Sequence, residues 1–178
     1  MLSFPELKVR PVTQNNWCDL ATLFEGRGGP HYCWCSLYRG KEPTKAEKKA
    51  GLNKFVCDAV PVGVLAYDGE RPIGWCSVAP RETYQKLARS RTMPRVTEPE
   101  TTTWSVLCFF VHRDYRGRRV AHKLLQGAVA YSRAEGAQVI EGYPFDSAGI
   151  TATHRGHSRI FEEGGFQQNG RRWHFELV

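Results

Sequence analysis

The chain has 178 residues, a length that suits one domain with one sizeable core. With 41% hydrophobic and 24% charged residues, its composition is that of an ordinary soluble globular protein, and no repeat or low-complexity segment stands out. Its longest apolar run, residues 106–111, is too short to span a bilayer, and residues 1–10 lack a signal pattern, so we expect a cytoplasmic protein with no membrane partner. The net charge of +7 favours a polyanionic partner, which could be nucleic acid, an acidic membrane or a phosphorylated cofactor, and it disfavours a polycationic acceptor.

The first half of the sequence predicts a strand, two helices and an irregular segment between the helices. Thr13 can cap the first helix and Gly26 ends it, while Thr44 and Glu47 form a capping-box pattern that opens a lysine-rich helix. The expected segments are, in order, a strand at 7–12, a helix at 13–26, an irregular stretch at 27–40 and a helix from 44 to about 58.

The second half alternates strands and helices. An Asp68-Gly69 turn joins two strands, the apolar run within Thr103–His112 suits a central strand covered on both faces, and Asn169-Gly170 closes a final hairpin. The expected segments are strands at 62–67 and 72–78, a loop at 79–102 with a short helix at 82–89, a strand at 103–112, a helix at 119–135, a strand at 139–143, a helix at 157–163 and the hairpin at 166–178. This order predicts a mixed sheet with helices, which is the α/β class.

The six cysteines are expected to be reduced thiols, because the chain can build a core without cross-links and nothing indicates export. The pair Cys33-x-Cys35 could suggest a metal site, but two cysteines do not fill a tetrahedral site. Strand-like spacing would place both on one face, so packing explains them. Cys33 with His154 and His157 could form a site in three dimensions, although the spacing does not require it, and we expect no metal.

A basic turn, Tyr115 to Ala121, lies between the central strand and its helix. The helix N-terminus presents unpaired N–H groups, Gly117 lets a ligand approach the backbone, and Arg116, Arg118 and Arg119 supply positive charge. The turn could be a solvated basic loop, but the strand before it and the helix after it favour a pyrophosphate site. The glycines of the P-loop and of the dinucleotide fingerprint are missing.

The stretch Phe109 to Ala121 resembles the acetyl-CoA motif of the GCN5-related N-acetyltransferases (GNAT), which reads Arg/Gln-x-x-Gly-x-Gly/Ala after an apolar strand. Phe161 to Phe166 is similar to the family's Tyr-Glu-x-x-Gly-Phe signature, and the order of elements agrees over essentially the whole chain. The segments 33–35, 74–81 and 141–144 are similar to a subgroup of mostly unassigned substrate.

The resemblance implies a GNAT-like sheet of about seven strands flanked by about four helices, in one acyl-CoA N-acyltransferase domain over residues 1–178. It implies transfer of an acetyl group from acetyl-CoA to an amine of a small molecule or peptide, by direct attack and without a metal. A backbone N–H near Phe110 or Val111 would polarise the thioester carbonyl. The implied cofactor residues are Phe109, Phe110, Val111, Arg116, Gly117, Arg118, Arg119, Val120, Ala121 and Phe161.

The chain departs from the family pattern at two positions. Arg119 stands at the motif's middle glycine, where its side chain could crowd the backbone or reach a phosphate, and Phe161 stands where a tyrosine often protonates the departing thiolate. Tyr143, at the end of the next strand, is our substitute acid. Glu141 and His112 are the candidate general bases, although the simpler interpretation is a solvated or ion-paired strand residue for Glu141 and an ordinary strand-end residue for His112.

The acceptor side is less defined by the sequence. Trp34 is the aromatic residue that we expect in an acceptor pocket, and the arginines of the 79–102 loop could meet an acidic substrate. A non-catalytic module that senses acyl-CoA or binds nucleic acid is the alternative function, although no aromatic stacking platform accompanies the basic residues. The chain could be a monomer or a homodimer, because the apolar residues of the C-terminal hairpin suit an interface or a core.

Overall fold

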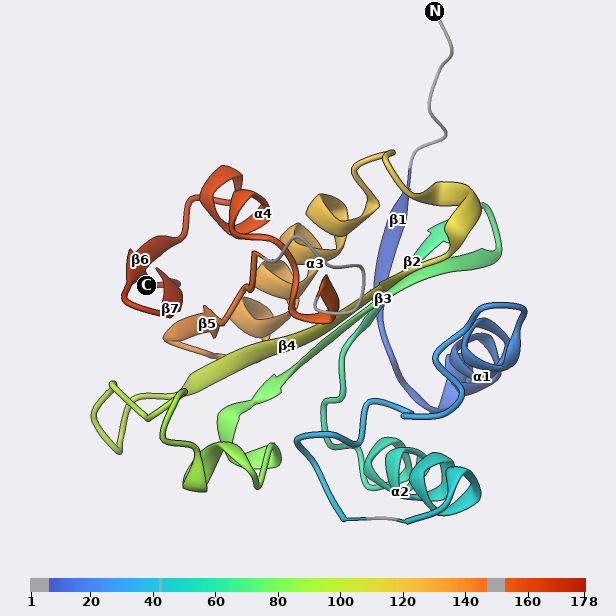
Figure 1. Cartoon of the computed structure of the whole chain (residues 1–178), viewed down its shortest axis with the longest axis horizontal. Helices are drawn as coiled ribbons and strands as arrows, with labels where there is room; N and C mark the ends of the chain where they lie inside the picture. Colours follow the sequence, from blue (N-terminus) through green and yellow to red (C-terminus); the bar gives the residue numbers. More distant parts are fainter. Residues whose placement is uncertain (1–6, 42, 147–152) are drawn as a thin grey trace, which may run out of the picture.

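The computed structural model describes residues 7–41, 43–146 and 153–178. Its described part contains one seven-stranded mixed sheet, in the order β1-β2-β3-β4-β5-β7-β6 (Figure 1). Neighbouring strands are antiparallel except for the parallel pair β4 and β5. The strands are β1 (Lys8–Pro11), β2 (Val64–Asp68), β3 (Arg71–Pro80), β4 (Thr103–Val111), β5 (Val139–Gly142), β6 (Gln167–Asn169) and β7 (Arg172–Glu176).

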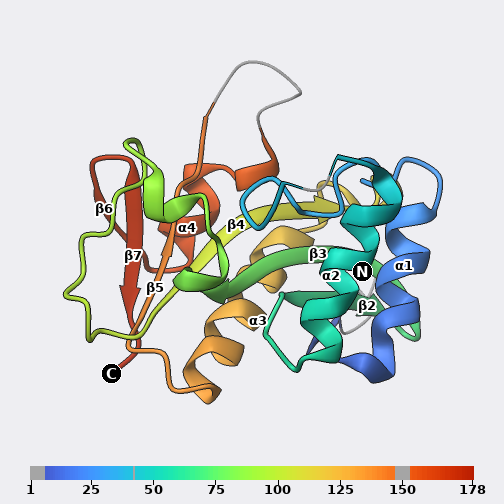
Figure 2. The ribbon, with the colours of Figure 1, turned by 90° about the horizontal axis from the view of Figure 1, so that it is seen from below.

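Four α-helices in the described ranges cover the two faces of this sheet, so the predicted mixed sheet of about seven strands with about four helices is confirmed. The helices are α1 (Trp17–Glu25), α2 (Lys45–Cys57), α3 (Val120–Ala134) and α4 (Ser158–Glu163). α1 and α2 lie on one side of the sheet and α3 on the other, as Figure 2 shows, and α4 packs against α3. None of these helices combines the length and the apolarity that crossing a membrane requires.

The central strand β4 packs on both faces, as its apolar run predicted. Phe109 and Val111 pack with α3, whereas Phe110 packs with the residues of α1 and Leu107 with Tyr143. Side chains of a strand alternate between faces, so this arrangement divides the core into layers above and below β4.

The structure corrects some of the predicted elements. The expected helix at 82–89 is wrong: two 3₁₀ turns, η2 (Arg81–Thr83) and η3 (Leu87–Arg89), are separated by Tyr84 in a non-helical conformation. The Tyr84 ring is buried and its hydroxyl accepts a hydrogen bond from Arg39, which holds the chain inward at this point. The expected strand-like spacing of Cys33 and Cys35 is also wrong, because this segment forms consecutive turns.

The remaining short elements are turns that flank helices or strands. Thr13 precedes a 3₁₀ turn, η1 (Gln14–Asn16), and α1 starts only at Trp17. The other two such turns are η4 (Arg113–Tyr115) and η5 (Thr153–Arg155).

The capping box of α2 forms as predicted and gives a direct test of local stability. The Thr44 hydroxyl accepts a hydrogen bond from the Glu47 N–H (3.2 Å), and the Glu47 carboxylate accepts one from the Thr44 N–H (3.0 Å). We expect Thr44→Ala to lower the free energy of unfolding by about 1 kcal/mol, because it leaves a helix N–H without its partner. Urea denaturation measures the loss, with the exposed Thr102→Ala as control. Equal losses in the two variants would contradict the role of the cap.

Candidate functional site

β4 has a β-bulge in its pairing with β3, at the point where its pairing with β5 ends. On the β3 side, Cys108 pairs with Ser77 and Val106 pairs with Val78, so Leu107 is an extra residue in β4. On the β5 side, pairing runs only from Thr103–Val139 to Val106–Gly142. A bulge bends its strand and increases the local twist. Beyond the bulge, the edge of β4 that would face β5 has no strand partner within the described residues.

A cavity of about 660 Å³ opens beside this unpaired part of β4. Its wall combines β4, the basic turn, the start of α3, the η5 region and the segment before α2. The lining residues are Pro30, Tyr32, Cys33, Cys108, Phe109, Phe110, Val111, Tyr115, Arg116, Gly117, Val120, Ala121, His154, Gly156, His157 and Ile160. We call this cavity the β4 cleft.

The basic turn presents its backbone to one end of the β4 cleft. Gly117 has φ = +74°, a left-handed conformation in which a side chain would be strained, and it lies in open space. α3 then begins at Val120, and its first N–H groups have no acceptor inside the helix. The partial positive charge of a helix N-terminus and these N–H donors suit a phosphate group.

Arg119, at the motif's middle glycine, also adopts a left-handed conformation (φ = +59°). Such a conformation costs a non-glycine residue roughly 1–2 kcal/mol, which gives a physical reason for glycine at this position of the motif. The Arg119 guanidinium contacts the Glu163 carboxylate of α4 at 2.7 Å. Its side chain therefore ties α3 to α4 and is not among the residues that line the β4 cleft.

Seven of the ten residues expected at the cofactor line the β4 cleft: Phe109, Phe110, Val111, Arg116, Gly117, Val120 and Ala121. Arg118 does not, and its guanidinium lies over the Tyr115 ring at 5.5 Å. Phe161 is fully buried and packs edge-on against Phe109, so the position of the family's usual tyrosine belongs to the core here.

Glu141 and Tyr143 belong to a buried polar network beside the strand separation. One carboxylate oxygen of Glu141 accepts hydrogen bonds from Arg81, from the Ser105 hydroxyl (2.9 Å) and from the Tyr143 hydroxyl (3.0 Å). The other oxygen accepts one from Arg172 at 2.7 Å. Only 1% of Glu141 is exposed, and both its oxygens are occupied, so it is an ion-paired residue rather than a free base. Burial, and then the Glu141 charge, raise the pKa of Tyr143, which keeps its phenol neutral.

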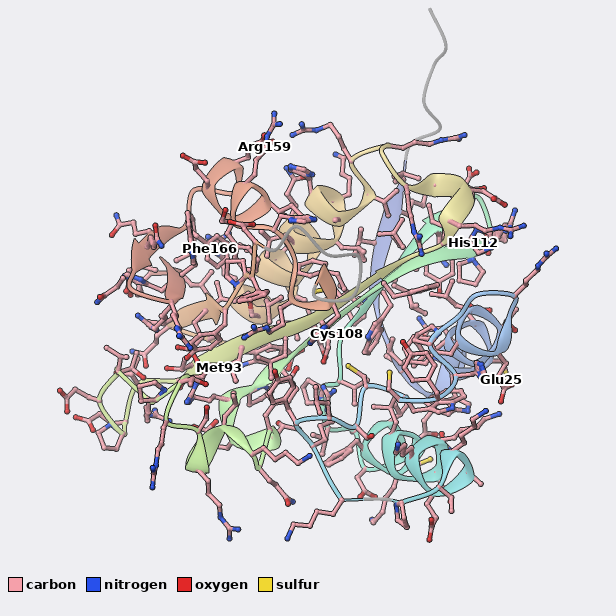
Figure 3. All side chains as sticks on the ribbon, in the orientation of Figure 1. Glu25, Met93, Cys108, His112, Arg159 and Phe166 are labelled. Atoms are coloured by element: carbon pink, nitrogen blue, oxygen red, sulfur yellow. The ribbon has the colours of Figure 1, made fainter. Side chains whose placement is uncertain are left out.

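His112 and His154 occupy different parts of β4's surroundings. Figure 3 shows Cys108 near the middle of β4 and His112 at its far end, where the imidazole contacts Asp114. Leu107, the bulge residue at which the pairing of β4 with β5 ends, is five residues from His112. In a strand, five residues span roughly 16 Å. His154 instead lines the β4 cleft, and its Nε2 is buried without a hydrogen-bond partner among the described residues. Burial, and then Arg155, lower the pKa of His154, so its imidazole is neutral at pH 7.

Trp34 is not on the wall of the β4 cleft. It is 2% exposed and packs against Trp17 and Phe24 in the core beneath α1 and α2, which corrects its expected place in an acceptor pocket. Two of the loop arginines are engaged within the protein: Arg81 is buried in the Glu141 network, and Arg95 donates to Glu82 and to loop carbonyls. Their hydrogen bonds hold the loop in place.

The residues that sequence reasoning missed come mainly from the segment before α2 and from η5. Cys33, His154 and His157, which we named only as a possible site in three dimensions that the spacing does not require, line the same cleft. No group of three or more metal-binding side chains lies together in the described part of the chain.

Comparison with known proteins places these features in a family. The family model described as "Acetyltransferase (GNAT) family" matches residues 31–145, more than half of the chain. The chain belongs to the GNAT acetyltransferase family. A comparison with curated protein sequences found no match.

Solved GNAT structures share the fold at low sequence identity. An N-acetyltransferase from Staphylococcus aureus Mu50 has 14% identity and a TM-score of 0.56, over 97% of this chain and 99% of that one. A GNAT acetyltransferase from Brucella melitensis in complex with acetyl-CoA has 8% identity and a TM-score of 0.54, over 98% and 90%. The aminoglycoside N-acetyltransferase AAC(6')-Iy in complex with CoA has 13% identity and a TM-score of 0.59, over 96% and 94%.

Proposed function

We propose that the chain is one N-acetyltransferase domain that transfers the acetyl group of acetyl-CoA to an amine acceptor. The observation that carries this proposal is the β4 cleft, which joins the N-terminus of α3 to the unpaired edge of β4. A phosphate site at one end and free strand-edge groups along the wall suit a long ligand that carries both a pyrophosphate and amide groups. GNAT membership and the acetyl-CoA and CoA complexes among the similar structures support this assignment.

Each part of the β4 cleft has a proposed role in binding. The Gly117 turn and the first N–H groups of α3 hold the pyrophosphate, with the Arg116 guanidinium beside it. The unpaired edge of β4 donates and accepts hydrogen bonds along the pantetheine arm, as a neighbouring strand would. A β4 N–H, near Phe110 or Val111, stabilises the negative charge that develops on the thioester oxygen during attack.

The proton of the attacking amine needs an acceptor, and we propose His154 for this role. It lines the β4 cleft, it is neutral at pH 7, and its Nε2 makes no other hydrogen bond among the described residues. Glu141 has both oxygens occupied, whereas the His112 imidazole contacts Asp114 and is not among the residues that line the β4 cleft. The amine attacks the thioester directly in this proposal, and the departing thiolate is a tolerable leaving group because thiol pKa values lie near 8.5.

For Tyr143, which the sequence suggested as the acid, we propose a positioning role instead. Its hydroxyl donates to Glu141 and it does not line the β4 cleft, but borders a second cavity of about 410 Å³ with Arg91 and Arg171. We propose that it positions the Glu141 network at the point where β4 and β5 separate.

The binding half of this proposal is tested by calorimetric titration of acetyl-CoA, CoA and dephospho-CoA. We expect saturable binding that Gly117→Val weakens at least tenfold, because the new side chain strains the backbone at φ = +74° and stands in the phosphate approach. Gly69→Val, in a turn with a similar φ of +59° outside the cleft, is the matched control.

The outcomes separate the candidate functions. Equal affinity of wild type and Gly117→Val would overturn the phosphate assignment. Saturable binding without thiol release, in a screen of amine acceptors, would favour the non-catalytic acyl-CoA-sensing alternative instead.

A further inference from the structure

The second cavity, which Tyr143 borders, lies at the end of β5, between the loop before β4 and the β6–β7 hairpin. Its volume is about 410 Å³, and the two segments that form its walls lie at the same end of the molecule in Figure 2. Within the described part of the chain, its lining includes three arginines and no carboxylate. The lining residues are Arg91, Thr92, Pro94, Val96, Tyr143, Asn169, Arg171 and Arg172. We call it the arginine cavity.

The buried network beside the arginine cavity carries more positive than negative charge. Arg81 and Arg172 are 5% and 6% exposed, and both pair with Glu141. Among the described residues, Glu141 is the only carboxylate that either guanidinium contacts. Two buried cations therefore share one anion, and a buried charge is costly unless an opposite charge compensates it. An anion in the adjacent cavity would restore the balance.

The two arginines of this network differ in how their hydrogen-bond donors are used. Arg81 donates from Nη1 to Glu141 and Tyr143, and from Nη2 to the Met93 carbonyl. Arg172 donates from Nε to Glu141 at 2.7 Å, whereas its Nη2 is buried without a partner among the described residues. An unsatisfied buried donor is costly, and a guanidinium matches the paired oxygens of a carboxylate or a phosphate. Since Arg172 lines the cavity, an oxyanion bound there can satisfy it.

Arg91 and Arg171 add positive charge from the two walls of the cavity, one from the loop and one from the hairpin. Both residues are exposed, and within the described residues neither forms an ion pair or donates a side-chain hydrogen bond. Their guanidinium groups can therefore reorient toward an anion without breaking an existing contact. Pro94 and Val96 make part of the wall apolar, which suits a ligand that also has a carbon skeleton.

We propose that the arginine cavity binds a small organic anion through a carboxylate or phosphate group. The buried Arg172 donates to the oxygens of that group, and Arg91 and Arg171 contribute charge from the exposed walls. Pro94 and Val96 contact the carbon part of the ligand. The arginine cavity shares no lining residue with the β4 cleft, so this binding site does not depend on the proposed acetyl transfer.

The first experiment locates the bound anion by NMR titration of the ¹⁵N-labelled chain. The probes are succinate and inorganic phosphate, with sodium chloride at the same ionic strength as the reference. We expect saturable shifts of the Arg172 side-chain Nε–H and of the Asn169 amide with at least one of the two probes. The probe that saturates at the lower concentration identifies the preferred group. The Gly117 amide reports separately on phosphate that binds at the β4 cleft.

The double variant Arg91→Ala/Arg171→Ala tests whether the arginines of the walls hold the anion. Both side chains are exposed, so the fold should persist. We expect the affinity for the probe to fall about tenfold or more, because contacts between charged groups are lost. Arg27→Ala is the matched control, since it removes an exposed arginine that does not line the cavity.

Thermal unfolding of the same variants gives a second readout. A ligand that binds the folded state raises Tm, whereas exclusion of an anion from the protein surface raises Tm in every variant alike. The probe that binds should therefore raise the Tm of the wild type and of Arg27→Ala more than that of the double variant.

Three results would overturn the proposal. The first is that chloride reproduces the shifts at Arg172 and Asn169 at the same ionic strength. The second is that the probes saturate only the Gly117 signal. The third is that the wild type and the double variant bind the probes with equal affinity.

Discussion

Glu141→Gln should lower the free energy of unfolding by about 3–5 kcal/mol, the largest stability effect that the structure predicts for a change of one side-chain atom. The substitution keeps the size of the side chain but removes its charge. Arg81 and Arg172, which are 5% and 6% exposed, would then remain in the interior without their counter-charge. Removal of one partner of a buried ion pair costs far more than the pair contributes, because the remaining charges stay desolvated.

Urea denaturation of Glu141→Gln beside Glu82→Gln measures this effect. Glu82 also pairs with an arginine, Arg95, at 2.7 Å, but its side chain is 65% exposed. Such a surface pair contributes about 0–1 kcal/mol. Similar losses in the two variants would mean that water reaches the Glu141 network in the folded protein.

His154→Gln should lower kcat by about a hundredfold or more, because a positioned general base contributes about 10² to 10⁴ to the rate. Affinity for acetyl-CoA should change little, since the proposed pyrophosphate and pantetheine contacts lie on α3 and β4. His112→Gln is the matched control, and it should keep kcat near that of the wild type. A loss of kcat in His112→Gln, with none in His154→Gln, would assign the proton to the other histidine.

The pH dependence of kcat gives an independent check on His154. The neutral imidazole is the base, and the lowered pKa of His154 keeps it neutral to a lower pH than an ordinary histidine. The fall of kcat at acidic pH should therefore occur, in the wild type, at a lower pH than the titration of an ordinary histidine would give. In His154→Gln this fall of kcat at acidic pH should disappear.

Local signals in the sequence predicted most of the fold. The capping box at Thr44 and the apolar run of β4 each act over a few residues, and both predictions hold in the structure. The final hairpin also forms, but Asn169 pairs with Arg172, so its turn is Gly170-Arg171, one residue later than predicted. The helix expected at 82–89 failed because a long-range contact, the burial of Tyr84 against Arg39, overrides the local preference.

The candidate site was only partly predictable for the same reason. The turn before α3 and the residues of β4 lie together in the sequence, so a single motif indicates them. Cys33 and His154 reach the β4 cleft from segments 121 residues apart, and no spacing rule connects them. The charge of Glu141 indicated chemistry, but its two arginine partners lie on distant segments, and only the fold reveals that it is already paired.

The unpaired part of β4 that begins at the bulge of Leu107 also bears on the risk of edge-to-edge association. An exposed strand edge is a template on which another chain can add a strand, and proteins usually block such edges with charges, prolines or short strands. Here the part of the β4 edge that does not pair with β5 lies inside the sheet, on the wall of the β4 cleft. α3 and η5 flank it. A strand that belongs to the sheet of a second molecule would meet these flanking elements, whereas a single extended ligand occupies less space. The same unpaired groups can thus stay available to a narrow ligand without promoting edge-to-edge aggregation.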